Sequence, residues 1–124
     1  MDDLIKKILI IDDEPRIRSI YVRLLVESGL KACWASNAQE ATNILIREKI
    51  DLVLLDINMP GIDGMTMFDI IQEYDPSLKV IVASVYQLFL QKRMIDRAYD
   101  YYDKSQGASL LLEKIFNALK GQAH

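Results

Sequence analysis

Short apolar runs alternate with longer stretches of helical periodicity, and this alternation constrains the fold more than any other feature of the sequence. The apolar runs fall at residues 7–11, 31–35, 51–56, 79–83 and 100–102. The clearest of them are rich in Leu, Ile and Val, as is typical of strands buried on both faces of a sheet. The helical stretches fall at residues 15–29, 38–45, 67–74, 88–98 and 109–120.

Several residues mark where the predicted helices begin and end. Pro15 suits the first turn of a helix, Asn37 with Glu40 resembles a capping box, and Pro76 ends the third helix. Alternating strands and helices predict an α/β fold, with a parallel sheet covered by helices on both sides. These units occupy the whole of the 124-residue chain. We therefore expect residues 1–124 to form one domain, with no output domain in this chain.

Polar residues follow the predicted strands at the edge where a sheet of this kind binds ligands. Asp12 and Asp13 come directly after the first strand, and Asp56 closes the third. Ser84 ends the fourth strand, and Lys104 lies in the loop after the fifth. Each has an ordinary explanation by itself: acids cap helices, serines occupy turns and lysines are solvated at surfaces.

Asp56 is harder to explain in this way because it closes the most hydrophobic run of the chain. Burial there raises the pKa of a carboxyl group unless a cation is near. Like-charged carboxylates about 4 Å apart repel by roughly 4 kcal/mol at an effective dielectric constant of about 20. A divalent cation relieves this repulsion, and an all-oxygen site suits Mg²⁺. Three acids, a hydroxyl group and a lysine together predict a site for a transferable phosphoryl group.

The residues that carry this pattern lie at 10–14, 51–64, 80–84 and 100–104. Over nearly its full length the sequence resembles the receiver domains of two-component response regulators. The resemblance implies a flavodoxin-like (βα)5 fold with strand order 2-1-3-4-5. It also implies a phosphorylated signalling protein that catalyses only its own phosphorylation and dephosphorylation, and is otherwise no enzyme. The acidic start of the chain, unlike a secretory signal, and the single cysteine suit a cytoplasmic protein.

The resemblance assigns a role to each of the site residues. Asp56 would be the phosphoacceptor, Asp13 a direct Mg²⁺ ligand and Asp12 an acid that holds the metal through water. Asn58 would add its backbone carbonyl to the metal, while Ser84 and Lys104 would bind phosphoryl oxygens. Tyr101 would be the aromatic switch that moves with Ser84. The phosphoryl donor would be a phosphohistidine of a sensor histidine kinase or of a phosphotransfer protein.

Three positions depart from the family pattern. Ser105 follows Lys104 where proline is usual, and a cis bond to serine would cost about 3 kcal/mol, so we predict a trans bond and an altered lysine loop. Val85 stands where a small residue is usual, and we expect its bulk to slow phosphoryl exchange. Arg97 stands where glycine is usual, in a slightly short stretch, which predicts a short or irregular fourth helix.

Other functions on a similar sheet fit the sequence less well. A phosphatase of the haloacid dehalogenase type needs an acid two residues after its nucleophile, and this position is Asn58. A nucleotide- or flavin-binding module needs a glycine-rich turn after the first strand, which Asp-Asp-Glu-Pro does not provide. The remaining alternative is a degenerate receiver that acts as a phosphorylation-independent interaction module.

Composition limits the partners. A net charge of −3 argues against direct nucleic-acid binding, and no apolar run is long enough for a membrane span. The lone Cys33 excludes an internal disulfide, and the only histidine, His124, is the last residue. Cys33 and Trp34 are expected to pack within the second strand. Most apolar residues between Ser84 and Lys104 are expected to pack in the core. The remainder, with Tyr99 and Tyr102, could form a face for a partner or for a homodimer through the region between the fourth and fifth helices.

Overall fold

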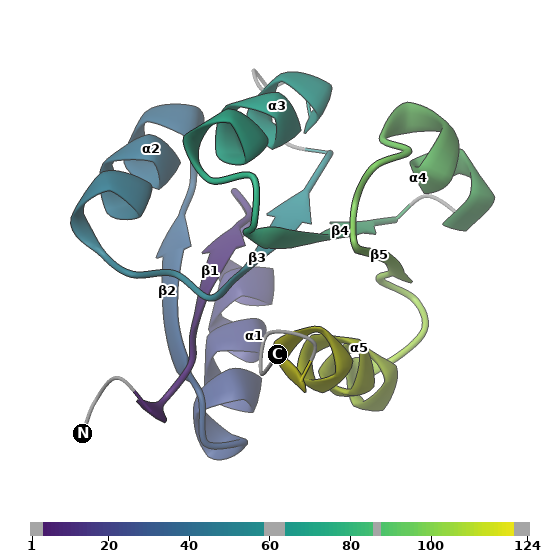
Figure 1. Ribbon diagram of the computed structural model, residues 1–124. Coiled ribbons are helices and arrows are strands. Elements are labelled where there is room, and N and C mark those ends of the chain that lie inside the picture. The colour runs from purple at the N-terminus through teal and green to yellow at the C-terminus, as the bar shows by residue number, and fades with distance from the viewer. Residues whose placement is uncertain (1–3, 59–63, 86–87, 121–124) are drawn as a thin grey trace.

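The computed structural model describes residues 4–58, 64–85 and 88–120, and of Phe89 the backbone only. Residues 59–63 of the segment 51–64, and the terminal His124, lie outside these residues. Strands and helices alternate along the chain, as Figure 1 shows. They are β1 (Lys7–Ile11), α1 (Pro15–Glu27), β2 (Lys31–Ala35), α2 (Ala38–Arg47), β3 (Leu52–Asp56), α3 (Gly64–Tyr74), β4 (Lys79–Ser84), α4 (Leu88–Met94), β5 (Asp100–Asp103) and α5 (Ala108–Lys120).

The strands form one parallel sheet in the order β2-β1-β3-β4-β5. The predicted fold class and strand order are therefore confirmed. The sheet places β1 and β3 side by side at its centre and β2 and β5 at its edges. β3 is buried along its whole length, as its unbroken apolar sequence predicts.

Two hydrophobic cores lie on opposite faces of the sheet. One packs against α2 and α3, and the other against α1 and α5, which lie together below the sheet in Figure 1. Neighbouring residues of β1 alternate between them: Leu9 and Ile11 belong to the first core, Ile8 and Ile10 to the second. Burial on both faces explains why the central strands carry apolar residues at every position rather than at every second one.

The start of α2 follows the predicted capping pattern with one difference. The side chain of Asn37 accepts a hydrogen bond of 2.9 Å from the backbone N–H of Glu40. The carboxylate of Glu40 then accepts from the N–H of Ser36, at 2.8 Å, rather than from that of Asn37. Both bonds satisfy backbone donors near the helix start, and therefore fix where α2 begins.

The fourth helix is shorter than the stretch 88–98 suggests, because α4 ends at Met94. The next residue, Ile95, turns into the core and is 1% exposed. The chain must then reach the edge of β4, where the N–H of Tyr99 donates to the carbonyl of Val80 at 2.9 Å. Arg97 binds Asp69 of α3 at 2.7 Å from within this connection. These contacts require the helix to end early, and a short fourth helix is confirmed.

The expectation that Trp34 packs within the second strand is wrong, because this residue is 49% exposed. It pairs with Ile10 of β1 and therefore points to the α1 side of the sheet, at the outer margin of an edge strand. Cys33 points the other way and packs partly buried against the core beneath α2, where burial raises the pKa of its thiol to about 11.

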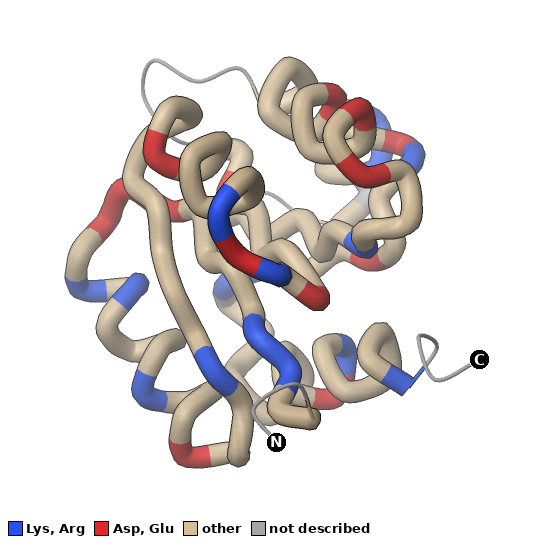
Figure 2. The backbone as a smooth tube through the Cα atoms, turned by 60° about the vertical axis from the view of Figure 1, so that its left-hand side comes forward, with Lys and Arg blue, Asp and Glu red and all other residues tan. Residues whose placement is uncertain are grey.

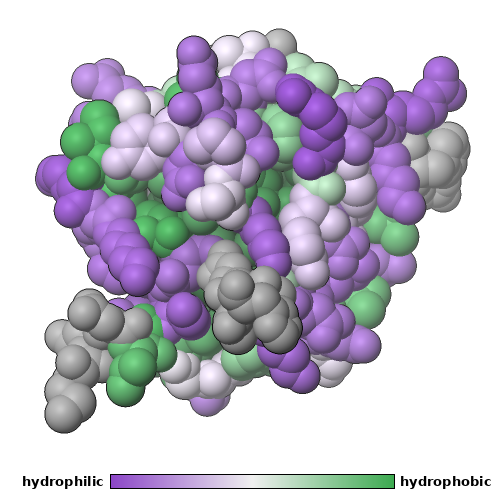
Figure 3. Space-filling model, viewed as in Figure 1, coloured by the Kyte–Doolittle hydropathy of each residue, from purple (hydrophilic) through white to green (hydrophobic). Residues whose placement is uncertain are grey.

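The surface mixes charges of both signs. Figure 2 shows Lys and Arg interspersed with Asp and Glu along the backbone. On the face shown in Figure 3, hydrophobic residues lie in separate spots between hydrophilic ones. Within the part of the chain that the structure describes, no helix is both long and apolar enough to cross a membrane.

Candidate phosphoryl-acceptor site

Strand register brings the first two acids together. β1 and β3 are paired as far as Ile11 and Leu55. The next residues are Asp12, directly after β1, and Asp56, the last residue of β3; they therefore lie side by side, and both are buried. The N–H of Glu14 donates to one carboxylate oxygen of Asp12 at 2.9 Å, which orients this side chain at the start of α1.

Lys104 reaches the two acids from the other half of the sheet. Its ammonium nitrogen lies 2.9 Å from a carboxylate oxygen of Asp12 and 3.1 Å from one of Asp56. Its backbone N–H donates to the carbonyl of Ser84 at 2.8 Å, which holds the lysine loop against the end of β4. The Lys104 side chain is only 12% exposed. One buried cation therefore bridges two buried carboxylates.

The protonation equilibria of the site reflect this crowding. Burial raises the pKa of Asp56, and the charge of Asp12 adds to this rise. The N–H of Asn58, which donates to Asp56 at 2.8 Å, and the charge of Lys104 oppose it without cancelling it. Burial lowers the pKa of Lys104, but the hydrogen bond to Asp12 and the charge of Asp56 outweigh burial, so this pKa is raised. The lysine therefore stays charged at neutral pH.

A metal ion fits the acidic end of the site. Asp12, Asp13 and Asp56 each offer one carboxylate oxygen, and these oxygens lie within 4.8 Å of one another. Asp13 is exposed, so an ion between the three would be open to water on one side. Carboxylates with water are the ligands that Mg²⁺ prefers, and the donor set therefore fits this ion.

The side chain of Asn58 has contacts that the sequence did not indicate. Its carbonyl oxygen accepts a hydrogen bond from the hydroxyl of Ser84 and another, at 3.3 Å, from the N–H of Val85. The sequence assigned a role only to the backbone of Asn58. Because the partners are 26 and 27 residues away, no local sequence signal marks this contact.

Arg18 is a second residue that the sequence did not single out. Its guanidinium donates to the backbone carbonyl of Asp12 at 3.2 Å. The same guanidinium lies 6.0 Å from the centre of the Trp34 ring. Arg18 thus connects the backbone of the acidic site with Trp34 on β2.

Tyr101, the predicted switch residue, has a different environment. It is buried in the core beneath α2 and α3, and its hydroxyl donates to the carbonyl of Ile95 at 2.6 Å. Burial raises the pKa of this hydroxyl. The tyrosine therefore ties β5 to the connection that follows α4.

The lysine loop is organised by Asp103 in place of proline. A carboxylate oxygen of Asp103 accepts from the N–H of Ser105 at 2.9 Å and from its hydroxyl at 2.7 Å. The N–H of Gln106 donates to the carbonyl of Asp103 at 2.9 Å and closes the turn. The bond between Lys104 and Ser105 is trans, as predicted. An aspartate-centred turn therefore presents the lysine without a proline.

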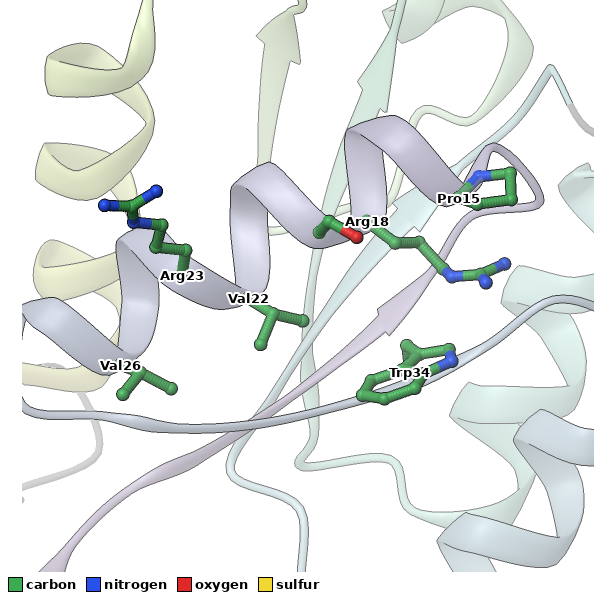
Figure 4. A pocket seen from close by; sticks show the side chains of 7 residues that line it. Pro15, Arg18, Val22, Arg23, Val26 and Trp34 are labelled. Atoms are coloured by element: carbon green, nitrogen blue, oxygen red, sulfur yellow. The ribbon is translucent and has the colours of Figure 1, made fainter.

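A groove of about 380 Å³ lies between α1 and the edge strand β2. Figure 4 shows Trp34 below the helix, with Val22 and Val26 along the same side and Arg18 reaching over the indole. Pro15, at the start of α1, also lines the groove. Trp34 is thus exposed because it forms part of the wall of this groove.

Comparison with known proteins identifies the family. Residues 8–116 match the family model of the response regulator receiver domain. The chain is a response regulator receiver domain. The receiver is 35% identical over 81 residues to sporulation initiation phosphotransferase F of Bacillus subtilis, and this alignment covers 65% of each protein. It is 32% identical over 117 residues to the C4-dicarboxylate transport transcriptional regulatory protein DctD of Pseudomonas aeruginosa, and spans 92% of the receiver but 25% of that protein.

Solved structures agree with this assignment. The response regulator TrrA of Thermotoga maritima, in complex with Mg²⁺-BeF, superposes with a TM-score of 0.84 at 34% identity, covering 93% of the receiver and 100% of TrrA. TrrA in complex with the histidine kinase ThkA gives the same TM-score and identity, with 93% and 99% covered. A CheY-like receiver domain of Methanospirillum hungatei gives a TM-score of 0.88 at 27% identity, with 96% and 97% covered.

Proposed function

We propose that the receiver accepts a phosphoryl group on Asp56 from a phosphohistidine of a sensor histidine kinase or a phosphotransfer protein. A carboxylate oxygen of Asp56 attacks the phosphorus atom, a P–O bond forms and the P–N bond to the donor imidazole breaks. The bonding electron pair returns to the imidazole nitrogen. The product is an acyl phosphate, formed once per chain, so the chemistry is that of a phosphoacceptor rather than of a turnover enzyme.

The observation that carries this proposal is the bridge from Lys104 to Asp12 and Asp56, at 2.9 and 3.1 Å. Negative charge on and around a carboxylate repels an anionic phosphoryl group. Part of this charge has to be neutralised before the carboxylate can attack. The buried ammonium supplies one positive charge at the attacking atom. The complexes of TrrA with Mg²⁺-BeF and with a histidine kinase support the same function for a relative.

The acidic residues would hold Mg²⁺ in distinct ways. We assign Asp13 and Asp56 as direct ligands, Asp12 as a ligand through water, and the backbone carbonyl of Asn58 as a further ligand. When bound, the ion would neutralise charge on the phosphoryl oxygens. Support comes from the three carboxylates, whose oxygens lie within 4.8 Å of one another.

Phosphorylation would act on partners through the surface formed by α4, β5 and α5. We propose that Ser84 binds a phosphoryl oxygen and that Tyr101 responds, changing the surface of α4, β5 and α5. Inactive and active forms that differ by a few kcal/mol can be interconverted by one new charge-assisted hydrogen bond. This surface carries exposed apolar residues that suit a downstream partner or a second copy of the receiver: Leu90, Met94, Tyr99 and Phe116.

Labelling with acetyl phosphate tests the proposal. We expect wild-type protein to be labelled in Mg²⁺ and not in EDTA, and Asp56→Asn to remain unlabelled. Asp96→Asn is the matched control, since Asp96 is an exposed acid outside the site. It should label like the wild type. No label on the wild type in Mg²⁺ would instead favour a phosphorylation-independent interaction module.

A further inference from the structure

Two hydrogen-bond donors at the end of β4 point at one acceptor. The hydroxyl of Ser84 and the N–H of Val85, which we call the donor pair, both donate to the side-chain oxygen of Asn58. The oxygen is the only hydrogen-bond acceptor of a carboxamide. Asn58 must therefore present its oxygen, and not its NH2 group, to the two donors.

The donor pair lies next to the phosphoacceptor. Asp56 pairs with Ala83 across β3 and β4, and Ser84 is the following residue. The same Asn58 donates its backbone N–H to Asp56 at 2.8 Å. Its backbone therefore contacts the phosphoacceptor while its side chain occupies the donors beside it.

A phosphoryl oxygen on Asp56 needs donors of this kind. It carries negative charge, and hydrogen bonds to a charged acceptor are about twice as strong as those to a neutral amide oxygen. Both acceptors cannot occupy the donor pair at once. The Asn58 side chain must therefore leave before the donor pair can bind the phosphoryl group.

We infer that the Asn58 side chain is an internal competitor for the phosphoryl position, an inference that rests on the proposed function. In the unphosphorylated receiver its oxygen stands in for a phosphoryl oxygen and holds Ser84 in place. Phosphorylation displaces it and releases the Ser84 hydroxyl to the new acceptor. Asn58 is thus a positioning residue that sets how readily the receiver is switched.

Binding of a phosphoryl mimic measures this competition. The probe is beryllofluoride with saturating Mg²⁺, titrated into wild type, Asn58→Ala and the matched control Asn117→Ala, which alters an exposed residue of α5. Removing a competitor that makes hydrogen bonds of ordinary net strength should tighten binding about tenfold in Asn58→Ala. Asn117→Ala should bind like the wild type.

A second measurement needs no probe. Amide hydrogen exchange at Val85 should accelerate in Asn58→Ala, because this N–H loses its acceptor. The N–H of Lys104, which donates to the carbonyl of Ser84 at 2.8 Å, should keep its protection and report that the strand end is intact.

The outcomes separate the inference from the proposed function. Tighter binding by Asn58→Ala, or binding by this variant alone, supports the inference that the Asn58 side chain competes for the donor pair. If the wild type binds beryllofluoride and Asn58→Ala binds it equally well or more weakly, the inference is overturned and the phosphoacceptor role stands. Unchanged amide exchange at Val85 has the same consequence. Binding by neither protein overturns both.

Discussion

Replacing Lys104 by methionine removes the only charge of its side chain while keeping most of its apolar volume. The ammonium contacts Asp12 at 2.9 Å and Asp56 at 3.1 Å in a site that is 12% exposed at the lysine. At an effective dielectric constant of about 20, each contact at this distance has a Coulomb energy of roughly 5 kcal/mol before desolvation. Removing one partner of a buried pair costs about 3–5 kcal/mol in practice, because the remaining charge stays buried.

We therefore expect Lys104→Met to lower the free energy of unfolding by about 3 kcal/mol at neutral pH without Mg²⁺. Saturating Mg²⁺ should remove at least half of this deficit, because a divalent ion can take over neutralisation of the same carboxylates. The assay is urea denaturation followed by circular dichroism, in EDTA and in Mg²⁺.

The pH dependence has a definite sign. Burial holds the pKa of Asp56 above the ordinary carboxyl value, so the folded state takes up a proton at higher pH than the unfolded state. The stability associated with this carboxyl is fully present below its ordinary pKa and is lost as pH rises through the raised one. Without Lys104 the pKa of Asp56 rises further, because the positive charge that opposes the rise is gone. The deficit of Lys104→Met should therefore shrink as pH falls from neutrality toward about 4.

Lys114→Met is the matched control. Lys114 pairs with Asp100 at 3.2 Å, but this aspartate side chain is 35% exposed and lies away from the acidic site. Its loss should cost less than about 1 kcal/mol and should not depend on Mg²⁺. A deficit of Lys104→Met below about 1 kcal/mol, or one that Mg²⁺ leaves unchanged, would refute the electrostatic reasoning.

Three further substitutions test other parts of the structure. Gly64→Ala places a Cβ atom 2.7 Å from Cγ2 of Ile57, the residue after Asp56, and should lower the unfolding free energy by about 1–3 kcal/mol in urea titrations; an unchanged midpoint would contradict the close packing. Tyr101→Phe removes the 2.6 Å bond to the carbonyl of Ile95 and should cost about 1 kcal/mol, measured in the same way; equal stability would show that this bond contributes nothing. Val85→Ala should speed labelling by acetyl phosphate or loss of the label, and unchanged rates for both would count against a steric role for the valine.

The predictable part of the fold depends on local patterns. Uninterrupted apolar runs at β1 and β3 are buried on both faces because strands at the centre of a covered sheet expose neither face. The carboxyl-end rule for parallel sheets then explains why Asp12 and Asp56 could be assigned to one site from the sequence. The aspartate-centred turn before Ser105 was not predicted in detail, but the trans bond followed from the missing proline.

The sequence alone determined the alternation of strands and helices and the chemical types at the strand ends, because both follow from the spacing of apolar and polar residues along a local stretch. Which atoms meet depends on how the strands are arranged in three dimensions. Lys104 contacts Asp12 across 92 residues, and the Asn58 side chain occupies donors 26 and 27 residues away, through the register of neighbouring strands. Trp34 is exposed because β2 lies at the sheet edge. Burial and convergence depend on which elements become neighbours, and that is a property of the assembled sheet.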